Sequence, residues 1–129
     1  MTFRKVSGLL ITLMIAAMMP LAAHHSFEAE YDTGKLVTLT GVVTKIDWMN
    51  PHAYITFNYE DPGGQMQTFV VELGPPYALT RGGWKRNTVK IGDTITVEDA
   101  AMAKDGTNRG GATRQTALIL ADGTKMVMR

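Results

Sequence analysis

Short runs of β-forming residues, separated by glycine and proline turns, most constrain what this chain can fold into. Apolar and polar side chains alternate within the runs, which are rich in valine, threonine and isoleucine. Alternation predicts half-buried strands, because successive side chains of a strand point to opposite faces of its sheet. The runs cover residues 36–47, 52–60, 65–73, 94–102, 113–120 and 125–128. The sequence therefore predicts an all-β fold.

One short helix interrupts this order. Residues 76–81 begin with a proline and are followed by Gly82-Gly83, the pairing typical of a helix start and end. Gly41 interrupts the first run and predicts a bulge or bend, which a small barrel needs to turn a corner. Three strands, a helix and two or three further strands indicate an OB-like barrel of five to six strands. An open β sandwich is the alternative.

Two polar segments carry no strand signal of their own. Residues 28–35 are expected to run along the surface. Residues 104–111 are glycine-rich and are expected to form a loop.

The first residues are typical of a secretion signal. Arg4 and Lys5 precede an apolar run over residues 9–19, and small residues close the segment at Ala22-Ala23. The run is shorter than the roughly 20 residues of a membrane-spanning helix. We therefore expect a signal peptide over residues 1–23 and one domain over residues 24–129. That domain would be periplasmic or secreted, without a membrane span after cleavage.

Composition excludes several function classes. The whole chain has a net charge of +1, and two of its cations lie in the signal, so the domain itself is close to neutral. Such a domain has no long-range attraction for nucleic acid. The absence of cysteine excludes disulfides, thiolate metal sites and thiol nucleophiles. Hydrolase, zinc-protease, P-loop and dinucleotide-binding motifs are also missing. We expect a binding module rather than an enzyme.

Two of the three histidines stand where the signal ends. Cleavage after Ala23 would make His24 the first residue, and its amine and ring nitrogen would form a chelate. Both groups lose protons near neutral pH and suit Cu(II). His52 would supply a third nitrogen and complete a T-shaped brace. His25 is the reserve ligand, because it points away from its neighbour in an extended chain.

A different cut gives a different chelate. Cleavage after Ala22 would make His25 the third residue, so that the amine, two deprotonated amides and the ring surround Cu(II) or Ni(II). We favour the first cut, because Leu21 is more acceptable than Pro20 three residues before it. His52 also has a simpler explanation, in which it opens a strand after the Asn50-Pro51 turn.

The competing hypothesis uses aromatic side chains and no metal. Trp48, Tyr54 and Trp84 would form a stacking face, which OB barrels use to bind ligands. The partner would then be a small ligand or another periplasmic protein.

The chain also resembles a widespread family of small, secreted bacterial domains of unknown function. The resemblance rests on His24-His25-Ser26-Phe27, Asn50-Pro51-His52, Glu72-Leu73-Gly74 and Gly83-Trp84. It implies export and a compact β domain, and it supplies no established activity or ligand. The preferred hypothesis is an exported module, monomeric or weakly dimeric, that captures or delivers copper.

Overall fold

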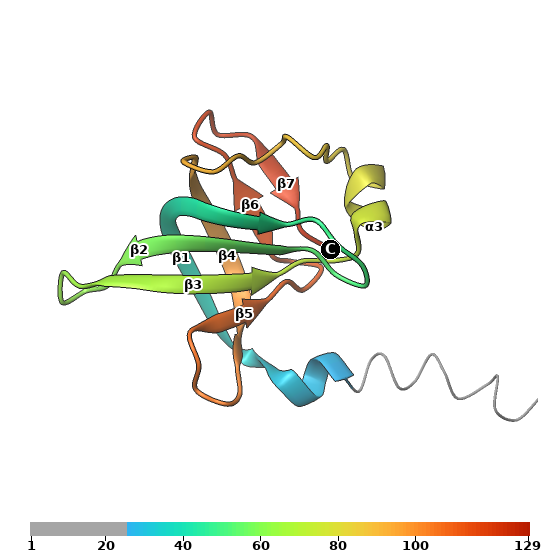
Figure 1. Ribbon diagram of the computed structural model, residues 1–129. Helices are drawn as coiled ribbons and strands as arrows, with labels where there is room; N and C mark the ends of the chain where they lie inside the picture. The colour runs from blue at the N-terminus through green and yellow to red at the C-terminus, as the bar shows by residue number, and fades with distance from the viewer. Residues whose placement is uncertain (1–25) are drawn as a thin grey trace, which may run out of the picture.

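The structure, a computed structural model, describes residues 26–129 of the chain (Figure 1). The expected signal peptide, its cleavage site, His24 and His25 lie outside the described residues. Within residues 26–129, no helix combines the length and the apolar character that a membrane crossing requires.

Seven strands and two short helical segments make up the described part of the chain. Residues 26–30 are helical, and α3 spans Pro76–Arg81. The strands are β1 (Tyr31–Asp47), β2 (Tyr54–Glu60), β3 (Met66–Glu72), β4 (Thr94–Ala103), β5 (Arg109–Gly111), β6 (Ala117–Ile119) and β7 (Lys125–Val127). Helix α3 begins after Pro75 and ends at Gly82, which confirms the helix predicted from its proline and glycines.

The strands form one sheet that closes on itself. Their order is β1-β2-β3-β5-β4-β6-β7, and a further pairing of β1 with β4 makes a ring through five strands. Figure 1 shows this ring, with β6 and β7 extending it beyond β4. The all-β class with a short helix between the third and fourth strands is confirmed. The ring takes the place of the open sandwich that was the alternative.

Strand β1 makes the closure possible because it pairs with two partners. Its first part, from Tyr31 to Val42, lies against β4, and its second part, from Val42 to Asp47, lies against β2. Register shifts lie on either side of Gly41. A Cβ atom at Gly41 would stand 2.2 Å from the carbonyl oxygen of Asn58. The predicted bend is therefore a close backbone approach that only glycine permits.

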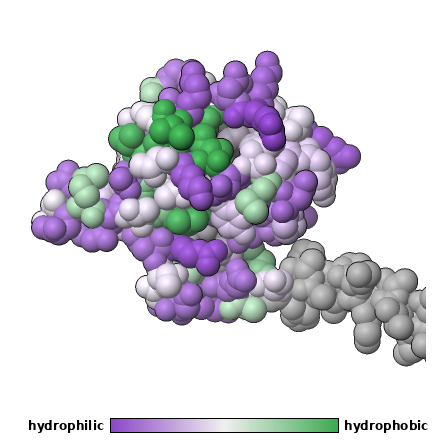
Figure 2. Space-filling view, viewed as in Figure 1, coloured by the Kyte–Doolittle hydropathy of each residue, from purple (hydrophilic) through white to green (hydrophobic). Residues whose placement is uncertain are grey.

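The ring encloses an apolar core. On β2, Ile55 and Phe57 are buried, as the alternation predicted. Phe57 stands opposite Phe69 of β3, with ring centroids 5.5 Å apart. On the outer face shown in Figure 2, apolar side chains gather over β1 and β6 within a mostly hydrophilic surface.

The two segments without a strand signal contain secondary structure that was not expected, although residues 28–35 lie mostly at the surface as predicted. Residues 28–35 are partly helical and partly the start of β1, where Tyr31 pairs with Ala103 and is only 2% exposed. Residues 109–111 form β5, parallel to β3 and antiparallel to β4. Glycines predict a loop there, but a Cβ at Gly110 would lie 2.8 Å from the Phe69 ring. Glycine is thus needed for packing, and neighbouring strands supply the pairing.

Candidate functional site

His52 lies in a hollow of about 210 Å³ at one end of the ring. Five parts of the chain meet there: the helical segment 26–30, the start of β1, the approach to and start of β2, the end of β3, and the C-terminal residue Arg129. The side chains that matter most below belong to Ser26, Phe27, Tyr31, His52, Tyr54 and Glu72. The hollow therefore brings together residues that are far apart in the sequence.

Backbone pairing at the mouth of β2 and β3 fixes His52 beside Glu72. The Ala53 amide donates to the Gly74 carbonyl, and the Leu73 amide donates to the Ala53 carbonyl. One residue further on, Tyr54 is the register partner of Glu72. The expectation that His52 opens a strand after a turn holds within two residues, since β2 begins at Tyr54.

Glu72 is a buried carboxylate with both oxygens engaged. Its Oε1 lies 2.7 Å from Nδ1 of His52, and its Oε2 accepts a 2.6 Å hydrogen bond from the Tyr31 hydroxyl. The Glu72 side chain is 8% exposed and that of His52 is 30% exposed. A buried charge is costly unless it is paired and hydrogen-bonded, and these two partners meet that requirement. The exposed edge of the cluster is the histidine ring.

Tyr31 stands behind Glu72 and keeps its proton. Burial, followed by the hydrogen bond to Glu72, raises the pKa of the Tyr31 phenol far above its ordinary value. Nη2 of Arg109 donates to the Tyr31 hydroxyl over 3.4 Å. Burial and the nearby Glu72 charge also raise the pKa of Tyr54. Both phenols therefore keep their protons further into the alkaline range, and the Tyr31 phenol donates its proton to Glu72.

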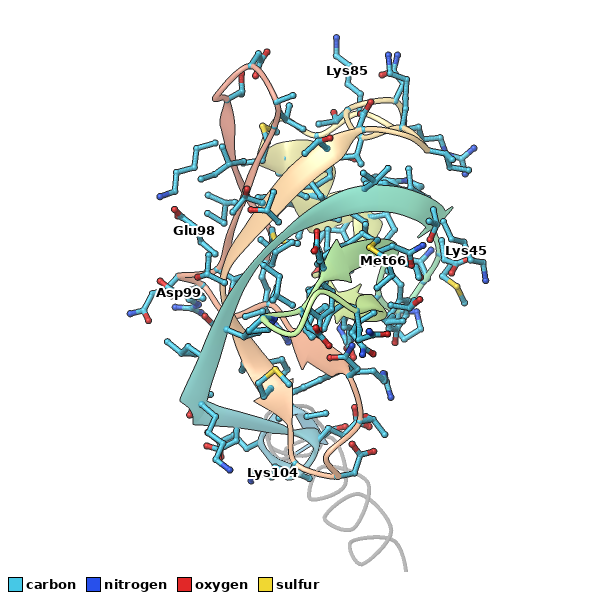
Figure 3. The ribbon with its side chains drawn as sticks, turned by 90° about the vertical axis from the view of Figure 1, so that its left-hand side faces the viewer. Lys45, Met66, Lys85, Glu98, Asp99 and Lys104 are labelled. Atoms are coloured by element: carbon cyan, nitrogen blue, oxygen red, sulfur yellow. The ribbon has the colours of Figure 1, made fainter. Side chains whose placement is uncertain are left out.

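The start of the described chain is packed against this hollow. The Phe27 ring lies 4.9 Å from the Tyr31 ring, and the Arg129 guanidinium lies over Phe27 at 4.7 Å. Nζ of Lys104 donates to the Glu28 carbonyl, and Figure 3 shows Lys104 beside this helical segment. A Cβ at Gly111 would come within 2.7 Å of both aromatic rings, so glycine makes room for them. Ser26 is thereby placed at the edge of the hollow.

The described part of the chain does not complete a metal site alone. Within residues 26–129, no group of three or more histidine and acidic side chains is arranged to hold an ion. His52 and Glu72 are a pair, and His24 and His25 are outside the described residues.

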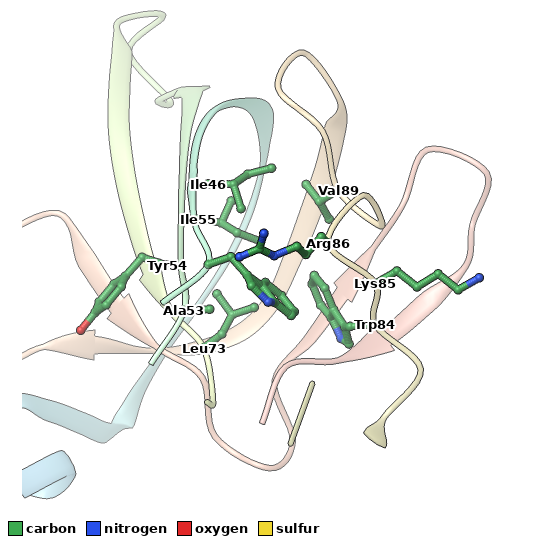
Figure 4. Close-up of a pocket in the computed structure, with 10 residues that line it drawn as sticks. Ile46, Ala53, Tyr54, Ile55, Leu73, Trp84, Lys85, Arg86 and Val89 are labelled. Atoms are coloured by element: carbon green, nitrogen blue, oxygen red, sulfur yellow. The ribbon is translucent and has the colours of Figure 1, made fainter. Parts of the chain in front are cut away.

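The aromatic candidates line a different and much smaller cavity. Trp48, Tyr54 and Trp84 border a space of about 10 Å³, room for about one water molecule. Trp84 is 3% exposed, and its Nε1 donates to the Val127 carbonyl over 2.7 Å. The two tryptophan rings lie 6.4 Å apart. Figure 4 shows the Tyr54 ring pointing away from Trp84, which agrees with its place in the His52 hollow.

Sequence reasoning missed Glu72 and Tyr31. Glu72 ends the apolar run Phe69-Val70-Val71, and a charge that closes a buried strand is a signal that could have been used. Tyr31 is the only aromatic residue in a polar stretch, and nothing local marks it as buried.

A family model described as a family of unknown function (DUF6152) matches residues 12–113. Comparison with curated proteins found no match, and comparison with solved structures found none either.

Proposed function

The chain belongs to the DUF6152 family of unknown function, and from its own side chains we propose that it is an exported copper-binding module. Removal of the signal after Ala23 leaves His24 as the first residue. Its amine and ring bind Cu(II) together with His52, and His25 is the reserve ligand. The domain captures or delivers copper in the periplasm or outside the cell, and it acts by binding rather than by catalysis.

One observation carries this proposal: Ser26 and His52 line the same hollow. A residue of extended chain spans at most about 3.3–3.6 Å, so His24 is within about 7 Å of Ser26 along the backbone. An amine and an imidazole on that short tether lie within reach of the hollow. The packing of Phe27 against Tyr31 holds the described end of this tether, at Ser26 and Phe27, beside the hollow.

The contact between His52 and Glu72 also supports copper binding by His52. Its Nδ1 is engaged by Glu72, so Nε2 is the nitrogen left to meet an ion. Histidines that bind metals usually donate their other ring N–H to a carboxylate or a carbonyl, which orients the ring. The amine and imidazole nitrogens together form a donor set that suits Cu(II).

Copper titration of two forms of the protein tests the proposal. One form begins at His24, and the other carries a Gly-Ser-Gly-Ser extension before it, which leaves no histidine among its first three residues. We expect the native form to bind Cu(II) more tightly, with a paramagnetic resonance spectrum typical of nitrogen ligands. Blocking the terminal chelate should weaken binding by at least about tenfold. Equal affinity and equal spectra in the two forms would contradict the proposal.

Two variants separate the two possible chelates. His52→Ala should change the spectrum if the brace forms, whereas a chelate made only by the terminus and His25 would keep the native spectrum. Tyr54→Phe is the matched control, because it alters the same hollow and removes no nitrogen. Mass spectrometry of exported protein locates the cleavage site. Retention of residues well before His24 would also contradict the proposal.

The second candidate is a ligand- or protein-binding module that uses Trp48, Trp84 and Tyr54. It is favoured by one observation, that these three residues border a single cavity together with Lys85 and Arg86. The cavity holds about 10 Å³, so it would have to open before a ligand could enter. We therefore prefer the His52 hollow, which already has the space of about 210 Å³.

A further inference from the structure

We infer that Glu72, supported by Tyr31, is a positioning residue that fixes the neutral His52 ring with its proton on Nδ1 and its lone pair on Nε2. The tautomer is set by the fold before any ion arrives. The consequence for copper rests on the proposed function, whereas the tautomer itself does not.

The direction of the hydrogen bonds follows from Arg109, which begins the series of contacts that runs through Tyr31 and Glu72 to His52. Arginine has only N–H donors and cannot accept a hydrogen bond. The hydroxyl oxygen of Tyr31 therefore accepts from Arg109 over 3.4 Å. The single phenol proton is then directed to Oε2 of Glu72, which lies 2.6 Å away.

The same order continues to the histidine. Glu72 accepts at Oε2, and its Oε1 faces Nδ1 of His52 at 2.7 Å. Imidazole is ordinarily more basic than a carboxylate, so the proton between these atoms belongs to the ring. Nδ1 is then a donor, and Nε2 of the neutral ring is the acceptor.

Rigid neighbours hold both positioning residues in place. Tyr31 is 2% exposed, and Glu72 lies opposite Tyr54 in the β2–β3 register. The backbone bonds between Ala53 and the Leu73-Gly74 segment set the separation of His52 from Glu72. The Nδ1–Oε1 contact is therefore a property of the β2–β3 pairing and does not depend on a metal.

This geometry restricts how an ion is bound. An ion that enters the hollow meets Nε2 and would have to displace Glu72 to reach Nδ1. His52 therefore contributes one nitrogen of known identity to the proposed site. The ring needs no rotation and no change of tautomer when the ion arrives.

Nitrogen NMR of the metal-free protein tests the tautomer directly. Long-range proton–nitrogen spectra are recorded at rising pH until the ring signals stop changing, so that neutral rings are compared. His52→Ala identifies the His52 signals by their loss. We expect Nδ1 to resonate as a protonated nitrogen and Nε2 as an unprotonated one. The opposite tautomer, or an equal mixture, would overturn the inference.

Two variants test whether Glu72 causes the preference. Glu72→Met keeps a side chain of similar length and removes the carboxylate that accepts from Nδ1. We then expect the His52 ring to become a mixture of tautomers. The double variant Tyr31→Phe with Glu72→Met also removes the stranded phenol donor, so its fold should tolerate the change better. It should show the same mixture. A His52 ring that keeps its Nδ1 proton in both variants would overturn the inference.

Tyr54→Phe is the control, because Tyr54 lines the same hollow outside this chain of hydrogen bonds and its loss should leave the tautomer unchanged.

Copper binding separates the inference from the proposed function. Loss of Glu72 should weaken Cu(II) binding by about 10–100-fold, the usual effect of removing a carboxylate that orients a ligand. A fixed tautomer in a protein that binds no copper would contradict the proposed function and leave the inference standing. Tight copper binding with a mixed tautomer in the native chain would contradict the inference and leave the proposed function standing.

Discussion

The two cavities beside Tyr54 differ in both chemistry and size. The His52 hollow measures about 210 Å³ and contains a paired histidine and carboxylate, whereas the tryptophan cavity measures about 10 Å³ and is mainly apolar. Close-packed aromatic surface contributes stability. A buried polar cluster adds little net stability even when every group is satisfied, but it holds its members in one geometry. The residues of the tryptophan cavity should therefore stabilise the fold, and those of the His52 hollow should bind the ion.

The largest effect on stability is expected at the tryptophan cavity. Trp84→Ala removes a buried ring and its hydrogen bond to Val127, and should lower the free energy of unfolding by about 3–5 kcal/mol. Urea unfolding followed by circular dichroism measures the loss. A change below about 1 kcal/mol would show that Trp84 is not a core residue, which would revive the stacking face as a binding surface.

The next effect is expected at the far end of the polar cluster. Tyr31→Phe leaves Oε2 of Glu72 without its donor, and a hydrogen bond to a charged group contributes about 1.5–3 kcal/mol. Tyr59→Phe is the matched control, because it removes a hydrogen bond from the Tyr59 hydroxyl to the neutral Asn108 amide. The control should lose about 0.5–1.5 kcal/mol in the same urea assay. Equal losses would contradict the greater strength expected of the Tyr31–Glu72 hydrogen bond.

Alkaline pH should also weaken the fold through Tyr31. The unfolded phenol loses its proton near its ordinary pKa of about 10, while the folded phenol keeps it because burial and Glu72 raise its pKa. The contribution of Tyr31 to the free energy of unfolding is therefore fully present below about pH 10 and falls as pH rises above that value. Urea midpoints at several pH values measure the decline, which should be shallower in Tyr31→Phe. The same slope in both proteins would contradict the raised pKa.

Much of the ring could be predicted from local sequence, and its closure could not. Alternation marks β2 and β3, and proline with glycine marks α3, because these signals arise within one element. Strand β5 has no such signal, since Gly110 and Gly111 are selected by contact with Phe69, Phe27 and Tyr31. Its pairing depends on strands that are distant in the sequence.

In the candidate site, too, some contacts follow from local sequence and others depend on distant strands. His52 stands out because the chain has three histidines, and its closeness to Glu72 follows from hairpin register around the turn at residues 61–64. The contact of Tyr31 with Glu72 joins β1 to β3, which are not paired with each other, so no local pattern predicts it. The expectations for His24 and His25 remain predictions, which the copper experiments address.

The smallest effect on stability is expected where the effect on binding is largest. His52→Ala removes a ring that is 30% exposed, and water in the hollow can take its place beside Oε1 of Glu72. The free energy of unfolding should therefore change by about 1 kcal/mol or less. Copper affinity should fall together with the change in the paramagnetic resonance spectrum. That combination would separate the role of His52 in binding from any role in folding. A loss as large as that of Trp84→Ala, with copper binding intact, would instead make His52 a structural residue and remove the contrast between the two cavities.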